Sequence, residues 1–207
     1  MIKFYTAATP HGQRAAFILE ECGLDYKVAC LDLMKGEQRD PAFLKLNPRG
    51  QIPVVVDDEG PGGQRLVITQ SAAILLHYAK THGVLWPEDK GQQALALQWT
   101  MHAASDISAL AGTLFAMRSF VPDQSDANLD FFLDRLEGHL RYIEGRLGEV
   151  AYLAGDISIA DLALYPMLVW EREALEDLGD WPCIAAWMER LEARPAIQRG
   201  MVAHERD

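Results

Sequence analysis

The side chains best placed to do chemistry fall within the first 71 residues. The first group is Thr9-Pro10-His11-Gly12, in which threonine is a favoured N-cap and proline is favoured at the first helical position. Free N–H groups and the dipole at a helix start attract anions, and a thiolate is one such anion. The Thr9 hydroxyl could donate a hydrogen bond to that sulfur. Taken alone, capping of the helix is the commoner role for Thr9.

A second group is the segment Asn47-Pro48-Arg49-Gly50-Gln51-Ile52-Pro53-Val54. A proline after the first residue of a strand must lie where its missing N–H is not needed. A cis Ile52–Pro53 bond would suit a tight turn into the strand, and it would leave the N–H and C=O of Ile52 to pair with an extended, peptide-like ligand. Taken alone, a trans proline is the commoner arrangement, because only about 5–6% of X–Pro bonds are cis.

The third group is Thr69-Gln70-Ser71, which precedes an apolar helix. The hydroxyl and N–H of Ser71 at a helix start can bind a carboxylate, and Gln70 can accept a hydrogen bond from an ammonium group. By itself, the segment also fits a plain N-cap, which is the commoner case.

Alternating short apolar runs and helical patterns surround these groups. Strands are predicted at 2–5, 26–31, 52–56 and 65–69, helices at 10–22 and 71–81, and an irregular or partly helical stretch at 35–48. The predicted order is β-α-β followed by β-β-α. A linker is expected at 83–90, and the chain beyond it reads as helix throughout. Helices are predicted at 92–120, 126–150, from 159 past Pro166, at 182–193 and at 195–202.

Ser158-Ile159-Ala160-Asp161 fits a capping box in which aspartate replaces the usual glutamate. Ile157 and Leu162 occupy the two positions of a hydrophobic staple. This pattern predicts a buried helix start, with structural roles for Ser158 and Asp161.

Composition indicates an ordinary globular protein. The 207 residues are 49% hydrophobic and 24% charged, with a mean hydropathy of −0.06, enough for a sizeable core. Apolar runs fall short of the roughly 18 residues that a membrane helix needs, and the N-terminus does not resemble a secretory signal. A cytoplasmic protein without a membrane partner is therefore expected.

Charge and cysteine content exclude further classes. The net charge of −11 argues against a nucleic-acid partner. Residues 1–50 sum to +1 and the remainder to −12, so the N-terminal part could host an anionic small molecule. Three scattered cysteines do not suggest a disulfide framework or a zinc site, and His77 and His82 are five residues apart, which does not place them on one helical face. No metal site is expected.

The three groups and the segment 155–161 together resemble the glutathione transferase family, in order and spacing, over essentially the whole chain. That family has a thioredoxin-like domain followed by an all-helical domain. The resemblance implies a glutathione-binding α/β domain at 1–82, a linker at 83–90 and an all-α substrate-binding domain at 91–207. It also implies glutathione as co-substrate and a homodimer.

The resemblance assigns roles to residues of the first domain. The backbone of Ile52, before a cis Pro53, would pair with the cysteinyl part of glutathione. Gln70 and Ser71 would hold its γ-glutamyl end, and Gln51 would approach the glycine carboxylate.

Within the family, the segments 9–12 and 35–38 look most like the bacterial Nu class, which has Thr-Pro-Asn-Gly at the first and a glutamine at the place of Gln38. Members of that class reduce disulfides with glutathione and often conjugate poorly. Thr9 would then face the sulfur as the catalytic residue, with His11 and Gln38 among the glutathione-binding residues.

Two residues depart from the Nu pattern. His11 stands where the class has asparagine, and Gln70 stands where it has glutamate. A neutral Gln70 would bind the ammonium group less strongly than a carboxylate does. His11 could donate to a thiolate or disulfide, with a charge expected to vary near neutral pH.

The sequence indicates the residues that would bind the acceptor substrate less clearly. His102, Phe115 and Arg118 lie on the first long helix, which borders the acceptor pocket in this family; core packing is the alternative for the apolar side chain. Three functions follow: a transferase whose activated thiol attacks small electrophiles or disulfides, a glutathione-dependent disulfide-bond oxidoreductase, and a non-catalytic scaffold that binds proteins.

Overall fold

The computed structural model describes residues 1–122, 125–171 and 180–206. Its contacts divide the chain into two compact units, Met1–Val84 with Glu192–Asp207, and Leu85–Leu191. The assignment of 1–82 to glutathione and of 91–207 to the acceptor stays a prediction. No described helix is both long enough and apolar enough to span a lipid bilayer.

The first unit is built on a four-stranded sheet in the order β2-β1-β3-β4. Its strands are β1 (Ile2–Thr6), β2 (Tyr26–Cys30), β3 (Val54–Asp57) and β4 (Leu66–Thr69). β1 runs parallel to β2 and antiparallel to β3, and β3 runs antiparallel to β4. The third strand begins later than predicted, after Pro53, because proline has no N–H to contribute to the ladder.

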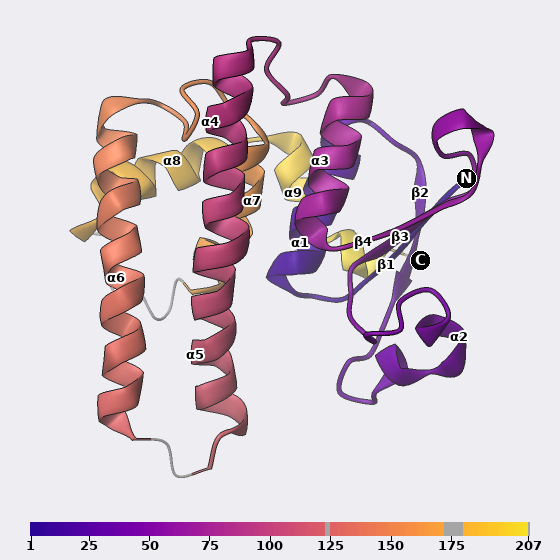
Figure 1. The fold of residues 1–207 in the computed structure, drawn as a ribbon, viewed down its shortest axis with the longest axis horizontal. Coiled ribbons are helices and arrows are strands. Elements are labelled where there is room, and N and C mark those ends of the chain that lie inside the picture. Colours follow the sequence, from indigo (N-terminus) through magenta and orange to yellow (C-terminus); the bar gives the residue numbers. More distant parts are fainter. Residues whose placement is uncertain (123–124, 172–179, 207) are drawn as a thin grey trace. The chain divides into compact units, whose positions relative to one another are not determined.

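The helices of this unit are α1 (Pro10–Glu21), α2 (Pro41–Leu44), α3 (Ser71–His82) and α9 (Pro195–Met201), with short 3₁₀ turns at Glu37–Arg39, Pro61–Gly63 and Ala203–Glu205. Figure 1 shows α1 and α3 on one side of the sheet and α2 on the other. Successive side chains of a strand point to opposite faces of the sheet, so the same strands pack against the helices on both sides. Phe4 and Val55 are wholly buried on one face, whereas Tyr5 and Val54 pack against Phe43 of α2 on the opposite face.

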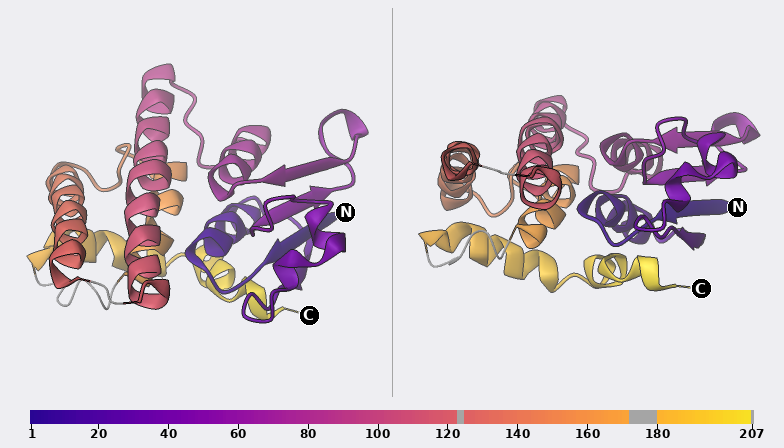
Figure 2. Two further views of the ribbon diagram at one scale, coloured as in Figure 1. Left: turned by 60° about the horizontal axis from the view of Figure 1, so that its bottom comes forward. Right: turned by 90° about the horizontal axis from the view of Figure 1, so that it is seen from below.

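The C-terminal segment packs against α1, as the views in Figure 2 also show. Arg194 binds the carboxylate of Glu21 with two hydrogen bonds of 2.8 and 2.9 Å, and Arg199 donates to Glu20 at 2.6 Å. A Cβ at Gly200 would lie 2.5 Å from the ring of Phe17, so glycine allows the two helices to approach closely.

The second unit is helical. It contains α4 (Lys90–Met101), a π-helical segment (His102–Ile107), α5 (Ser108–Phe120), α6 (Asp126–Glu149), α7 (Ile159–Trp170) and α8 (Pro182–Glu192). The helix predicted at 92–120 is continuous, but a π-helical segment interrupts its α-helical geometry, which the sequence pattern did not predict. Figure 1 shows α5 and α6 side by side. The sheet and helices of the first unit, followed by the helical second unit, confirm the predicted fold class.

The start of α7 confirms the predicted capping box. Ser158 Oγ accepts from the N–H of Ala160 at 3.3 Å, and Asp161 Oδ2 accepts from the N–H of Ser158 at 2.9 Å. Asp161 Oδ1 accepts from the backbone of Leu153 at 3.1 Å and from the indole of Trp187 at 2.9 Å. Burial raises the pKa of Asp161. These bonds join the start of α7 to α8 and to the turn before it.

Candidate functional site

The three groups of candidate residues meet at one end of the strands, where β1, β2 and β4 end and β3 begins. We call this end of the sheet the sheet edge. Val54 pairs with Tyr5 and with Thr69, so the segment before β3 lies between the ends of β1 and β4. β2 runs parallel to β1 and pairs Cys30 with Thr6, so the segment after β2 also lies at this edge. The topology therefore brings together the chain at 7–12, 31–38, 47–53 and 70–71.

Thr9 occupies the N-cap of α1 and is half-buried. Its Oγ accepts a hydrogen bond of 3.1 Å from the N–H of Gly12, which confirms the capping role. Because the oxygen is the acceptor in that bond, its own proton is available to a group outside the helix. A Cβ at Gly12 would collide with Thr6 Oγ1 and lie 2.6 Å from the Ala7 carbonyl, so only glycine fits under this turn.

A buried arginine lies behind this helix start. Arg14 is only 1% exposed, and its guanidinium donates to Ser71 Oγ at 3.1 Å. Ser71 Oγ in turn lies 3.5 Å from His11 Nδ1. Burial lowers the pKa of Arg14 to about 10, so it stays charged at neutral pH. These contacts link the starts of α1 and α3 through one cation.

The imidazole of His11 is neutral at physiological pH. Burial, and then the charge of Arg14, lower the pKa of His11 from 6.5 to about 4. The expectation that the charge of His11 varies near neutral pH is therefore wrong, since a sequence reveals neither the burial of the ring nor the cation near it. A neutral imidazole still offers one N–H donor.

Ser71 is the first residue of α3 and lies one position after the N-cap. Gln70 occupies the cap with φ 71° and ψ 112°, and its side chain makes no capping bond. The plain N-cap reading of Ser71 is therefore wrong. A positive φ in a residue other than glycine is uncommon and tends to mark binding and active sites. Gln70 is exposed and Ser71 is 6% exposed.

The loop before β3 is held by its own side chains. The Ile52–Pro53 peptide bond is cis, as the resemblance implied. Buried Asn47 donates from Nδ2 to the carbonyl of Gln51 at 2.6 Å and so fixes the approach to the proline. Gln51 is exposed, Ile52 is half-buried and Pro53 is buried. Gly50 adopts φ 62°, a conformation that side chains rarely adopt.

Gln38 lies beside this loop, because a Cβ at Gly50 would be 2.9 Å from the Gln38 carbonyl. The Gln38 amide nitrogen donates to Leu33 at 3.2 Å. Its Oε1 is buried and accepts no hydrogen bond from any residue that the structure describes. A buried acceptor without a donor costs about 1–3 kcal/mol. Gln38 therefore offers an acceptor to a ligand carrying N–H or O–H groups.

Comparisons with known proteins decide the family. The family model described as "Glutathione S-transferase, N-terminal domain" matches residues 8–81, and that described as "Glutathione S-transferase, C-terminal domain" matches 122–190. Disulfide-bond oxidoreductase YfcG of Escherichia coli (strain K12) is 31% identical over 205 residues, covering 98% of this chain and 95% of the relative. The chain belongs to the glutathione S-transferase family.

Solved structures of this family agree with the fold. A glutathione transferase from Burkholderia graminis, with two glutathione molecules bound per subunit, has a TM-score of 0.92 and 30% identity and covers 100% of this chain and 89% of that one. A glutathione transferase from Pseudomonas putida, with one glutathione disulfide bound per subunit, has a TM-score of 0.89 and 28% identity and covers 97% and 90%. The resemblance found in the sequence is thus confirmed.

The acceptor residues expected in a glutathione S-transferase do not form a cluster here. Along the continuous helix, Phe115 and Arg118 lie roughly 20 and 24 Å beyond His102, from the rise of 1.5 Å per residue. Arg118 pairs with Glu171 at 3.5 Å, and the ring of Phe115 packs edge-on against Phe120. An acceptor role for these residues stays a prediction.

One site residue of this transferase, Arg14, was not singled out from the sequence, and a second, Asn47, was quoted in its segment without a role. Arg14 lies four residues before Ile18, on the apolar face of α1, and a charge on such a face was the available signal. Asn47 belonged to the second group, but its role was not predicted, because it depends on the distance between Asn47 and Gln51 in the folded loop.

Proposed function

We propose that this protein binds reduced glutathione at the sheet edge and uses its thiolate in exchange with disulfides. The observation that carries the proposal is the Thr9 hydroxyl, which accepts from Gly12 and keeps a proton for an incoming sulfur. A thiolate there would also meet the free N–H groups of the first turn of α1. A thiol pKa of about 8.5 falls by two units for only about 2.7 kcal/mol of such interactions.

The remaining contacts follow the shape of the tripeptide. The backbone of Ile52 pairs with the cysteinyl unit, and Gln51 approaches the glycine carboxylate. Ser71 and Gln70 hold the γ-glutamyl end, where the buried charge of Arg14 behind Ser71 favours a carboxylate. His11 and Gln38 would supply further polar contacts, with Gln38 Oε1 accepting from the ligand.

The reaction has two exchange steps. The bound thiolate attacks one sulfur of the substrate disulfide, forming a mixed disulfide with glutathione and releasing the other half as a thiolate. A second glutathione thiolate then attacks the glutathione sulfur of the mixed disulfide, forming glutathione disulfide and releasing the second substrate thiolate. Two glutathione molecules are oxidised for each disulfide reduced.

Disulfide exchange is preferred over conjugation on two grounds. The Escherichia coli relative is named a disulfide-bond oxidoreductase, and the Pseudomonas putida relative holds glutathione disulfide. Conjugation of small electrophiles would use the same thiolate, so the substrate distinguishes the two activities.

The test is turnover of a model disulfide by glutathione, with glutathione disulfide measured by coupled reduction. The wild type is expected to exceed the uncatalysed rate, and Ser71→Ala is expected to lose affinity for glutathione. Ser119→Ala, an exposed serine of α5, is the matched control and should behave as the wild type. No turnover by a protein that binds glutathione would refute disulfide exchange, and conjugation of an electrophile would then be measured.

Three further expectations belong to this proposal. The residues at 1–82 are the glutathione-binding domain and those at 91–207 the acceptor domain. The protein forms a homodimer, which sedimentation of the purified chain tests. It works in the cytoplasm, in line with the free thiols of Cys22, Cys30 and Cys183, which persist in reducing compartments.

A further inference from the structure

A cluster of two imidazoles and a carboxylate lies within the helical unit. His102 and Asp106 come from the π-helical segment between α4 and α5, and His139 comes from α6. One nitrogen of each histidine and one oxygen of the aspartate all lie within 4.8 Å of one another. Nδ1 of His102 is 3.0 Å from Asp106 Oδ2, and the two imidazole centroids are 5.0 Å apart.

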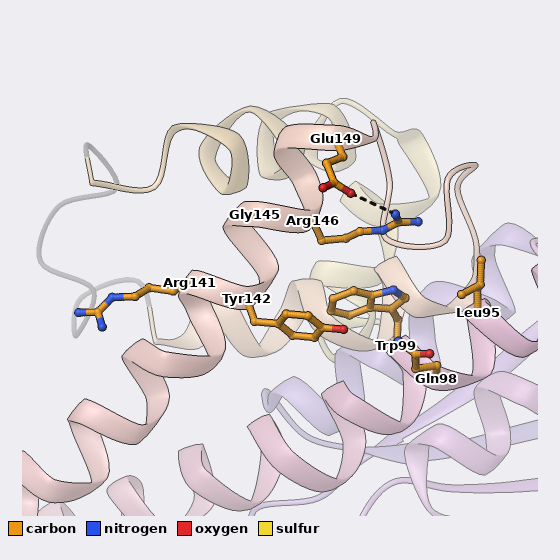
Figure 3. Close-up of a pocket in the computed structure, with 8 residues that line it drawn as sticks. All are labelled: Leu95, Gln98, Trp99, Arg141, Tyr142, Gly145, Arg146 and Glu149. Carbon is orange, nitrogen blue, oxygen red and sulfur yellow. Dashed lines mark ion pairs between the residues drawn. The ribbon is translucent and has the colours of Figure 1, made fainter.

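The position of His102 is fixed by aromatic neighbours. Its side chain is 13% exposed. Trp99 and Tyr142 each present a ring edge-on to the imidazole, at a centroid distance of 5.6 Å. These two rings stack on each other at 4.8 Å, and Figure 3 shows them extending toward each other from α4 and α6. The imidazole therefore has little freedom to turn.

One buried atom of this cluster has no partner in the part of the chain that the structure describes. His102 Nε2 is buried and has no hydrogen-bond partner among the residues described. Nδ1 of His102 already faces Asp106. Flipping the imidazole to exchange Nδ1 and Nε2 would therefore leave the other nitrogen without a partner. Burying an unpartnered polar atom is unfavourable, which points to a partner other than the residues that the structure describes.

We propose that His102, Asp106 and His139 bind a divalent transition-metal ion, with zinc as the preferred ion. Two imidazoles and a carboxylate form a ligand set that zinc uses in proteins, and imidazole nitrogen disfavours magnesium and calcium. Bonds of about 2.0–2.1 Å in a tetrahedron separate the ligand atoms by about 3.3 Å. The ligand atoms lie within 4.8 Å of one another, so the widest pair would close by at most about 1.5 Å, a movement that the side chains of Asp106 and His139 would make toward His102.

Asp106 can serve the site in two ways. Its carboxylate can bind the ion directly together with the two imidazoles, in which case His102 binds through Nδ1, the nitrogen that faces Asp106. Alternatively, it can hold Nδ1–H of His102 and direct Nε2 at the ion, as carboxylates commonly do behind metal-binding histidines. In either case the ion joins α6 to the α4–α5 helix.

The sequence did not suggest this site, since His139 is 37 residues beyond His102. Only the packing of α6 beside the π-helical segment brings the ligands together. Short π-helical insertions occur frequently at functional sites, which is consistent with a ligand here. The site lies in a different unit from Thr9 and Ser71, so it does not depend on the proposed glutathione chemistry.

The test is calorimetric titration of the tag-free, chelator-treated 207-residue chain with Zn²⁺, and the absorption spectrum of the protein with Co²⁺. The wild type is expected to bind one Zn²⁺ per chain and to melt at a higher temperature with it. His139→Gln is expected to weaken Zn²⁺ binding at least about tenfold. His204→Gln is the matched control, because His204 also lies beside a carboxylate, 3.8 Å from Glu205, and should leave binding unchanged.

Asp106→Asn separates the two roles of the aspartate. Weaker Zn²⁺ binding with altered Co²⁺ bands supports direct ligation, whereas weaker binding with unchanged bands supports orientation of His102. Circular dichroism of each variant checks that it folds. The proposal is overturned if the wild type shows no saturable Zn²⁺ binding, or if folded His139→Gln and Asp106→Asn bind Zn²⁺ as tightly as the wild type.

Discussion

Replacing Thr9 separates its two roles, helix cap and donor to sulfur. In Thr9→Ala, the N–H of Gly12 loses its acceptor, and a bound sulfur loses the hydroxyl proton. Thr9→Ser keeps the hydroxyl and removes only a methyl group, so it is the matched control. Both variants retain Pro10 at the first position of α1 and the glycine under the turn.

The magnitudes of the two effects differ. Loss of a threonine N-cap costs about 1 kcal/mol of folding stability, within a range of about 0.5–2. A hydrogen bond to a charged acceptor contributes about 1.5–3 kcal/mol. At 1.36 kcal/mol per pKa unit, Thr9→Ala is expected to raise the pKa of bound glutathione by about 1–2 units. Below that pKa, the thiolate fraction and the turnover rate then fall roughly tenfold to a hundredfold.

The assay is a pH titration of thiolate ultraviolet absorbance with glutathione saturating the protein, together with turnover of a model disulfide. Thr9→Ser is expected to match the wild type within about threefold. If Thr9→Ala binds glutathione with an unchanged thiol pKa and an unchanged rate, Thr9 is only a cap. His11 or the backbone N–H groups would then stabilise the sulfur.

Three other substitutions test the surroundings of the site and the core. Between the ordinary pKa of 6.5 and the folded pKa of about 4, only the unfolded chain protonates His11, so folding stability falls by about 3 kcal/mol as pH falls through that window. His11→Gln should remove this loss in urea unfolding measured at several pH values, and an unchanged pH dependence would contradict the assignment. Gly50→Ala should weaken glutathione binding at least about tenfold in calorimetry, since its Cβ meets the Gln38 carbonyl at 2.9 Å. Gly62→Ala is the control, because Gly62 has a similar positive φ and nothing lies within 4 Å of its Cβ, so glutathione binding should persist. An equal loss of binding in both variants would implicate backbone strain alone. Asp161→Ala removes the acceptor of the Leu153 and Ser158 N–H groups and the Trp187 indole, at about 1–3 kcal/mol each, and of the weaker bond from the Ser158 hydroxyl. The free energy of unfolding should therefore drop by at least about 3 kcal/mol, and a loss under about 1 would be incompatible with the described network.

Features that depend on neighbouring residues were predicted well from the sequence. The start of α1 at Pro10 follows from the cap and proline pair, and the start of α7 follows from Ser158 and Asp161. In both cases the stabilising bonds join residues two or three apart, so the sequence carries the information. The sheet edge also follows from the order of elements, because strand direction decides which loops meet.

Features that depend on tertiary packing were not predicted. The neutral state of His11 results from burial and from Arg14, and neither is visible in the residue spacing. Asp161 also binds Trp187, 26 residues further on, a contact that no local motif implies. The π-helical segment that carries His102 leaves the apolar pattern of the long helix almost unchanged, so periodicity alone reads it as α-helix.

The central claim is that the sheet edge binds glutathione for disulfide exchange. The measurement that tests it most directly is calorimetric titration of the purified protein with reduced glutathione and then with glutathione disulfide. Saturable binding of both forms, weakened in Ser71→Ala, is the predicted result. Binding of the reduced form alone would favour conjugation over disulfide exchange. Binding of neither form by the folded protein would contradict the account and favour a non-catalytic scaffold.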